Sequence, residues 1–178
     1  ADVGEMALRK ANLVKIWVDS VNGTKPAMKP EIYKAIIDQS HREHLRVAAH
    51  IYTLADAKAV VRAGVDILAH SVRDQPVDQE LIQLMKHRHV WYIPTFTVDE
   101  SAYIYAEHPA FMQLDFFKDS LPSSTLDMIE SDSYSASIER DPKTSRHKAD
   151  FQMDRKNLKL LYSAGVRVGF GTDSGASP

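Results

Sequence analysis

Residues 46–70 read RVAAHIYTLADAKAVVRAGVDILAH, and this stretch decides the fold class. Two short apolar runs, 45–50 and 65–70, enclose a segment with the start and stop signals of a helix. Thr53 to Asp56 resembles a capping box with Asp in the Glu position, and Gly64 stands where a helix end favours glycine. Nearly continuous apolar runs are typical of strands buried on both faces. The stretch therefore predicts a β-α-β unit.

The same alternation extends in both directions along the chain. Further strands are predicted at 13–18, 90–95 and 166–171. Further helices are predicted to begin at Pro30, after Asp78 and at about 146, and Gly165 follows the last of them. Because strands that alternate with helices form parallel sheets, the predicted class is α/β, with about five parallel strands covered by helices.

The segment 97–145 interrupts the alternation of predicted strands and helices. It holds several aromatic residues and then a Ser-rich stretch, 120–137. We interpret it as a partly helical, lid-like insertion after the fourth strand, within a single domain that spans 1–178. An irregular packed loop without substrate contact explains the same pattern.

Composition excludes several classes of protein. The chain has 22 Lys plus Arg against 24 Asp plus Glu, a net charge of -2 and a pI of about 6.5, which is unlike a nucleic-acid-binding module. It has no cysteine, so disulfides, thiolate zinc sites and cysteine nucleophiles are excluded. Because no apolar run suits a membrane span or a signal peptide, we expect a soluble chain without a membrane partner, its compartment undecided.

Four unusual residues lie in or just beyond predicted strands. His50 and His70 end two strands, Asp173 follows a third, and Lys15 lies inside the apolar strand 13–18. Ligand sites of parallel α/β folds lie at the C-terminal strand ends. A buried lysine needs a partner or the loss of its charge. Together the four residues indicate a metal site, although a single histidine at a strand end is more often a hydrogen-bonded structural residue.

The other chemically suggestive residues complete no known motif. His41 and His44 lie near a helix end without the His-Glu-x-x-His order of zinc proteases, and 87–89 precedes its strand, at the opposite rim. The glycines of 169–175 do not have the spacing of a dinucleotide-binding fingerprint. We interpret these residues as outside the site.

The sequence resembles the metal-dependent amidohydrolase superfamily, in the branch of imidazolonepropionases and prolidase-like Xaa-Pro dipeptidases. The matching segments, in chain order, are Val14-Lys15-Ile16, Ala48-Ala49-His50-Ile51-Tyr52-Thr53, Ala69-His70-Ser71, Ile93-Pro94-Thr95 and Gly169-Phe170-Gly171-Thr172-Asp173-Ser174-Gly175. The resemblance implies a partial (β/α)8 TIM barrel, strands four to eight, incomplete at both ends. It departs from the pattern at residues 69–71, where many relatives read Glu-His-Gly.

The resemblance also implies roles for the residues. Lys15 would be carboxylated by CO2 and would bridge two divalent metal ions. His50 and His70 would bind one ion, and Asp173 would bind the other and serve as general base. Tyr52 matches a position that contacts a substrate carboxylate. Zinc is the first candidate for the metal, with manganese, iron and cobalt as alternatives.

The reaction implied by the resemblance is hydrolysis of an amide or peptide bond. A divalent metal lowers the pKa of water and polarises the scissile carbonyl, so that hydroxide attacks the carbonyl carbon at neutral pH. Asp173 would pass the proton to the leaving amine. The expected substrates of the full-length parent are small molecules such as dipeptides or N-acyl amino acids.

Length leaves other hypotheses open. A complete barrel needs roughly 250 residues, and this chain has 178. We therefore expect a fragment that begins in the helix before strand four and lacks the His-x-His metal ligands of strand one. The alternative is a catalytically inert folding unit, and a phosphosugar-binding barrel is a third option. An open arc of strands would also expose edges that favour association between copies.

Overall fold

The computed structural model describes residues 2–20, 23–95 and 97–173, which form two compact units. The first, here called the sheet unit, comprises Ala1–Thr95 and Met153–Gly171. The second, here called the helical unit, comprises Phe96–Gln152 and Thr172–Pro178. The two units are described separately.

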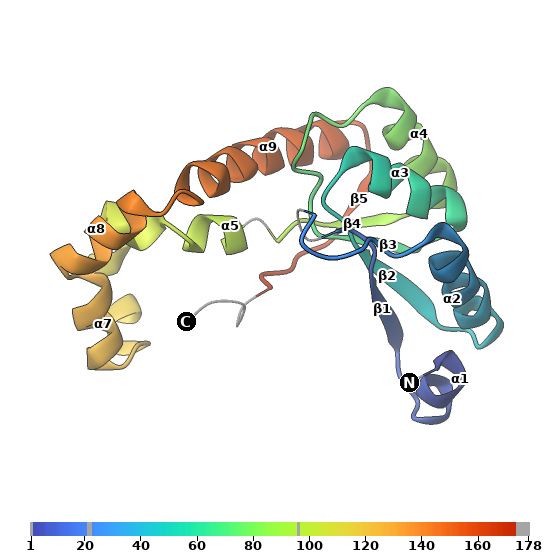
Figure 1. The fold of residues 1–178 in the computed structure, drawn as a ribbon, viewed down its shortest axis with the longest axis horizontal. Coiled ribbons are helices and arrows are strands. Elements are labelled where there is room, and N and C mark those ends of the chain that lie inside the picture. The colour runs from blue at the N-terminus through green and yellow to red at the C-terminus, as the bar shows by residue number, and fades with distance from the viewer. Residues whose placement is uncertain (1, 21–22, 96, 174–178) are drawn as a thin grey trace. The chain divides into compact units, whose positions relative to one another are not determined.

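The sheet unit contains one five-stranded parallel sheet with the strands in sequential order (Figure 1). The strands are β1 (Leu13–Trp17), β2 (Arg46–His50), β3 (Ile67–Ala69), β4 (Trp91–Ile93) and β5 (Arg167–Val168). Strict sequential order of parallel strands is that of a barrel wall. The predicted α/β class with five parallel strands is confirmed, and each strand is shorter than the apolar run that predicted it.

Helices connect the strands and end where the sequence indicates. They are α1 (Val3–Leu8), α2 (Pro30–Arg42), α3 (Leu54–Ala63), α4 (Gln79–Arg88) and α9 (Thr144–Ser163). The Thr53 hydroxyl accepts the Asp56 N–H at 3.0 Å, and the Asp78 carboxylate accepts the Leu81 N–H at 3.0 Å. Gly64 ends α3 with φ of 106°, a conformation that glycine adopts without steric cost.

One face of the sheet packs against α2, α3 and α4 (Figure 1). The strands contribute side chains that point toward these helices, and the helices contribute their apolar stripes. The buried core includes Val14, Ile16, Val47, Ala49, Leu68 and Tyr92 from strands, and Ile37, Val60, Val61, Leu81, Met85 and Leu161 from helices. Burial of each large aliphatic side chain stabilises the fold by roughly 1.5–3 kcal/mol.

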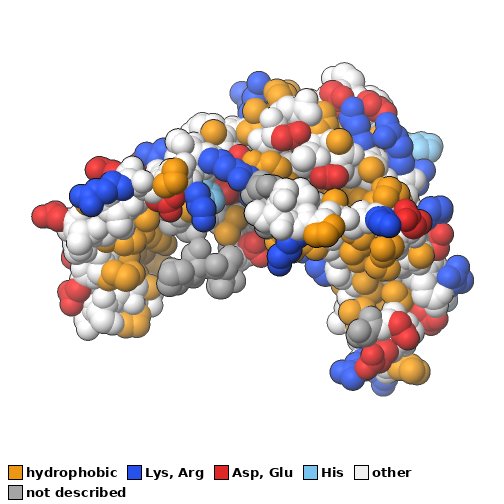
Figure 2. Space-filling view, viewed as in Figure 1, with side chains coloured by type: hydrophobic (Ala, Val, Ile, Leu, Met, Phe, Trp, Pro, Cys, Tyr) orange, Lys and Arg blue, Asp and Glu red, His pale blue; other side chains and the backbone are white. Residues whose placement is uncertain are grey.

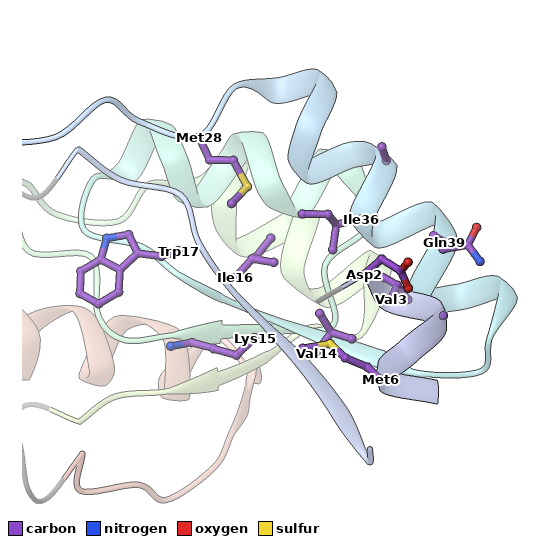
Figure 3. A pocket seen from close by; sticks show the side chains of 12 residues that line it. Asp2, Val3, Met6, Val14, Lys15, Ile16, Trp17, Met28, Ile36 and Gln39 are labelled. Atoms are coloured by element: carbon purple, nitrogen blue, oxygen red, sulfur yellow. The ribbon is translucent and has the colours of Figure 1, made fainter. Parts of the chain in front are cut away.

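The expectation of strands buried on both faces is wrong for β1. Val14 and Ile16 are buried, whereas Leu13, Lys15 and Trp17 on the same strand are exposed. The two sets alternate because successive side chains of a strand point to opposite faces. Among the described residues, β1 is covered on the face toward α2 alone, and Figure 3 shows Lys15 on the opposite side of β1 from Ile16.

The helical unit is built from short helices. They are α5 (Thr97–Ser101), α6 (Asp115–Asp119), α7 (Ser123–Ile129), α8 (Asp132–Arg140) and the 3-10 turns Ile104–Glu107 and Ala110–Gln113. Tyr105, Phe111 and Phe117 form an aromatic cluster with ring centroids 5.4 to 6.4 Å apart. The role of the segment 97–145 as a lid stays a prediction. Within the described ranges, no helix combines the length and the apolar character needed to cross a membrane.

Candidate metal site

The structure brings His50 and His70 together. His50 is the last residue of β2, and His70 directly follows β3, the neighbouring strand in the sheet. Their rings meet edge to face with centroids 4.8 Å apart, and both residues are buried. The two histidines therefore meet at the C-terminal rim, where the strand-end argument predicted them.

Each histidine ring is held by a partner on a neighbouring strand end. Nε2 of His50 lies 2.9 Å from Oδ2 of Asp19. Nδ1 of His70 lies 2.6 Å from the Thr95 hydroxyl. The two rings are thus held through different nitrogens, Nε2 on His50 and Nδ1 on His70.

The free nitrogen of His50 has the properties of a metal ligand. Nδ1 is buried and has no hydrogen-bond partner among the described residues. Burial first, and the neighbouring His70 second, lower the pKa of His50 to about 4, while Asp19 opposes the shift. The ring is therefore neutral at pH 7, as a metal-binding imidazole must be. Because an unsatisfied buried polar atom is costly, this nitrogen calls for a ligand.

The indole ring of Trp17 also contacts the His50 ring. The Trp17 indole stacks on the His50 ring with centroids 3.6 Å apart and an interplanar angle of 13°. Trp17 also donates its indole N–H to Oδ1 of Asp19 at 3.1 Å. Since β1 and β2 pair with Trp17 opposite His50, the register of the sheet places the three side chains together.

Hydrogen bonds from Asn157 and Tyr92 restrain the loop that follows His70. The Asn157 side chain, fully buried in α9, accepts the Val77 N–H at 2.9 Å and donates to the carbonyls of Val72 and Gln75 at 2.8 and 3.0 Å. The Tyr92 hydroxyl accepts the Val72 N–H at 3.3 Å. These bonds restrain the backbone that carries His70.

Lys15 is placed differently from its prediction. The prediction of a buried lysine is wrong, because Lys15 points to the uncovered face of β1 and its side chain is exposed. Its charge is nonetheless felt at the site, since it is among the groups that lower the pKa of His50. An exposed ammonium group has no desolvation cost to offset, so the physical argument for its carboxylation is weaker than the sequence suggested.

Asp173 and Tyr52 stay predictions as site residues. Asp173 is exposed, has φ of 55° and belongs to the helical unit. Tyr52 lies two residues beyond His50 in the sheet unit, with the Arg73 guanidinium 5.1 Å above its ring centre. The ring of Tyr52 is therefore already engaged on one face.

The donor set fits part of a metal site. Among the residues that the structure describes, no group of three or more His, Asp, Glu or Cys side chains could hold a metal ion. The buried, unpartnered Nδ1 of His50 beside His70 fits two ligands of a divalent metal. Lys15 is the candidate for a further ligand that the sequence offers.

Sequence reasoning missed the residues that hold the histidines. Asp19 lies two residues past the end of β1, so the same strand-end rule that selected His50 and His70 could have found it. Thr95 was part of a quoted motif without an assigned role, and Asn157 lies inside a helix with no local signal. The interpretation of His41 as a residue outside the site gave it no partner, and the structure places its Nε2 2.9 Å from Oδ2 of Asp66.

A cavity of about 710 Å³ opens beside β1, between α1 and α2. Met6, Val14, Met28 and Ile36 line its apolar part, and the β1 residues from Val14 to Trp17 border it (Figure 3). Hydrophobic side chains gather over the same region in the space-filling view (Figure 2). The cavity lies along the outer edge of the strand that carries Lys15.

No protein-family model matches the chain. The uncharacterized protein Rv2915c of Mycobacterium tuberculosis is 28% identical over 99 residues, which cover 53% of this chain and 26% of that protein. An uncharacterized protein of Mycobacterium bovis, Mb2939c, matches with the same identity and coverage.

Solved structures match over nearly all of the chain. A prolidase complexed with N-methylphosphonate-L-proline superposes with a TM-score of 0.65 at 20% identity, over 96% of this chain and 36% of its own. A Xaa-Pro dipeptidase with bound methionine superposes with a TM-score of 0.60 at 19% identity, over 98% of this chain and 39% of its own. A putative prolidase from Bifidobacterium longum superposes with a TM-score of 0.65 at 19% identity, over 98% of this chain and 38% of its own.

The chain spans a little over a third of the length of these solved structures and about a quarter of the curated relatives. At these identities the likeness concerns the fold. It agrees with the sequential parallel sheet and with the resemblance drawn from the sequence. The chain therefore has the fold of part of a prolidase or amidohydrolase barrel.

Proposed function

We propose that this chain carries metal-binding residues of an amide-bond hydrolase that acts on dipeptides or N-acyl amino acids. The observation that carries the proposal is the buried Nδ1 of the neutral His50 ring beside His70, which has no hydrogen-bond partner within the described part of the chain. Similarity in fold to solved structures described as a prolidase and a Xaa-Pro dipeptidase supports the substrate class.

Each proposed residue has a separate task. His50 would bind the metal through Nδ1, because Asp19 engages its other nitrogen, and His70, whose Nδ1 lies against the Thr95 hydroxyl, would be the second ligand. Lys15 would supply a third ligand as a carbamate, formed from its neutral amine and CO2 with loss of one proton. Asp173 would accept a proton from the attacking water and deliver it to the leaving amine. Tyr52 would contact the carboxylate end of the substrate.

A bound divalent metal, with zinc the first choice, would supply a water of lowered pKa and polarise the scissile carbonyl. The protein's own contribution is to keep the two imidazole rings next to each other, with centroids 4.8 Å apart, in a buried position. Two ligands that are held in place before a metal arrives reduce the free energy lost to reorganisation.

The first test is zinc content. The purified chain is incubated with zinc, freed of excess metal and analysed by elemental mass spectrometry, beside His50→Ala and His41→Ala variants. His41 is the matched control because it also contacts a carboxylate, Asp66, at 2.9 Å. We expect about one equivalent in the wild type and in the control and none in His50→Ala. Equal zinc in all three proteins, or none in any, contradicts the proposal.

Activity separates the proposed hydrolase from an inert folding unit. The zinc-loaded chain is incubated with a Xaa-Pro dipeptide and with an N-acyl amino acid, and the released amine is quantified. Hydrolysis that disappears in His50→Ala supports catalysis by this chain. Zinc binding without hydrolysis of either compound favours the noncatalytic alternative.

A further inference from the structure

Asp19 joins two ring nitrogens through its two carboxylate oxygens. Its Oδ1 accepts the indole N–H of Trp17 at 3.1 Å, and its Oδ2 lies 2.9 Å from Nε2 of His50. Asp19 is 7% exposed, and the two rings that it contacts stack on each other 3.6 Å apart. The three side chains are therefore in contact with one another beside His70.

We infer that Asp19 is a positioning residue that fixes the proton of the neutral His50 ring on Nε2. A carboxylate can only accept hydrogen bonds, so the ring nitrogen that faces it must donate. A neutral imidazole carries a single N–H, and its other nitrogen, here the buried Nδ1, then keeps its lone pair. The use of that lone pair by a metal rests on the proposed function, whereas the position of the proton does not.

Trp17 determines which side-chain atom of residue 19 faces His50. An indole N–H can only donate, so the atom of residue 19 that faces Trp17 must be an acceptor. In an Asp19→Asn variant this requirement turns the amide oxygen toward Trp17 and the amide NH2 toward Nε2 of His50. Nε2 must then accept, and the ring proton moves to Nδ1, the nitrogen proposed to bind the metal.

The tautomer of His50 is read by long-range 1H–15N NMR of the metal-free chain, with the His50 signals assigned by their loss in His50→Ala. We expect the Nε2–H form in the wild type and the Nδ1–H form in Asp19→Asn. The same tautomer in both proteins would overturn the inference.

A double variant separates this mechanism from a merely structural role of Asp19. In Trp17→Phe/Asp19→Asn the phenyl ring can still stack on His50, but the N–H that orients the amide is gone. The amide can then turn its oxygen toward Nε2, and we expect the Nε2–H form to return in part. A double variant that stays wholly in the Nδ1–H form would contradict the orienting role of Trp17.

Zinc affinity, measured by competition with a chromophoric chelator, links the tautomer to the metal. We expect Asp19→Asn to lower the affinity by about 10- to 100-fold, as for other residues that hold metal-binding histidines. The matched control is Asp66→Asn, which alters the other Asp–His contact of the sheet unit, at the same 2.9 Å, and should leave the affinity unchanged. Far-ultraviolet circular dichroism confirms that each variant is folded.

The two proposals fail in different ways. If the wild-type chain binds no zinc but its His50 tautomer inverts in Asp19→Asn, the metal proposal is wrong and the positioning role holds. If zinc binds equally well to the wild type and to folded Asp19→Asn, the positioning role is wrong and the metal proposal holds.

Discussion

Asn157 is the residue through which α9 holds the backbone that follows His70. Its amide makes three hydrogen bonds to the loop after β3 and is fully buried. An alanine in its place would leave one N–H and two carbonyl groups without these partners. The cost of such unsatisfied groups is about 1–3 kcal/mol each before the loop relaxes.

We therefore expect Asn157→Ala to lower the free energy of unfolding by about 2–4 kcal/mol. Urea denaturation followed by circular dichroism measures the change. The neighbouring Lys156→Ala, at an exposed position, is the control and should stay within about 0.5 kcal/mol of the wild type. A loss below about 1 kcal/mol in Asn157→Ala would mean that water replaces the amide.

Residues of the candidate site differ in how far the sequence could predict them. His50 and His70 were found because both follow strands of one parallel sheet, and that rule needs no side-chain detail. The exposure of Lys15 depends on which sheet face is covered, and the apolar run 13–18 does not contain that information. The role of Asp19 depends on which nitrogen of His50 faces it, which only the folded geometry fixes.

At the level of elements, α3 and α4 are joined by a partly exposed ion-pair cluster. Lys58 contacts both Asp78 and Glu80, and Asp78 also caps the N-terminus of α4. Hydrogen bonds from Lys58 hold the pKa values of Asp78 and Glu80 below their ordinary 3.8 and 4.5. A carboxyl group whose pKa is depressed by folding stabilises the fold above its unfolded pKa and loses that contribution as pH falls through the folded value.

We expect Lys58→Met to lower the thermal midpoint at pH 7, and the difference from the wild type to shrink as pH falls below about 4. Differential scanning calorimetry between pH 7 and pH 3 measures both curves. Added salt should also reduce the difference, because the carboxylates of Asp78 and Glu80 are open to screening. A difference that is independent of pH would assign the effect to the lysine stem rather than to its charge.

Elements themselves were largely predictable from local signals. Pro30, Thr53, Asp78 and Gly64 mark helix ends because each satisfies a backbone requirement that does not depend on the rest of the fold. Strand lengths were less predictable. The hydrogen-bonded ladder ends before the apolar run does, since residues such as His70 leave the sheet to form the rim.

At the scale of the whole molecule, β1 forms one edge of the sheet, because β2 is its only strand partner in the described chain. Leu13 is 38% exposed and Trp17 is 50% exposed on this strand. An exposed edge with apolar side chains is a template for pairing with another strand. We propose that copies of the chain associate through β1.

We expect the wild type to associate in a concentration-dependent manner and Leu13→Lys to remain monomeric, because a charge on an edge strand opposes pairing. Analytical ultracentrifugation over a range of concentrations measures the mass. Leu160→Lys on α9 is the matched control, since Leu160 is 39% exposed and lies outside the sheet. Equal association of both variants would exclude β1 as the interface.

The stack of Trp17 on His50 also gives the protein an internal optical probe. The chain has 2 tryptophans, and the indole of Trp17 lies 3.6 Å from the imidazole at the proposed metal site. Its fluorescence emission depends on the ring against which it lies, while Trp91 supplies a background that Trp91→Phe removes. Events at His50 can thus be followed in real time in the unlabelled protein.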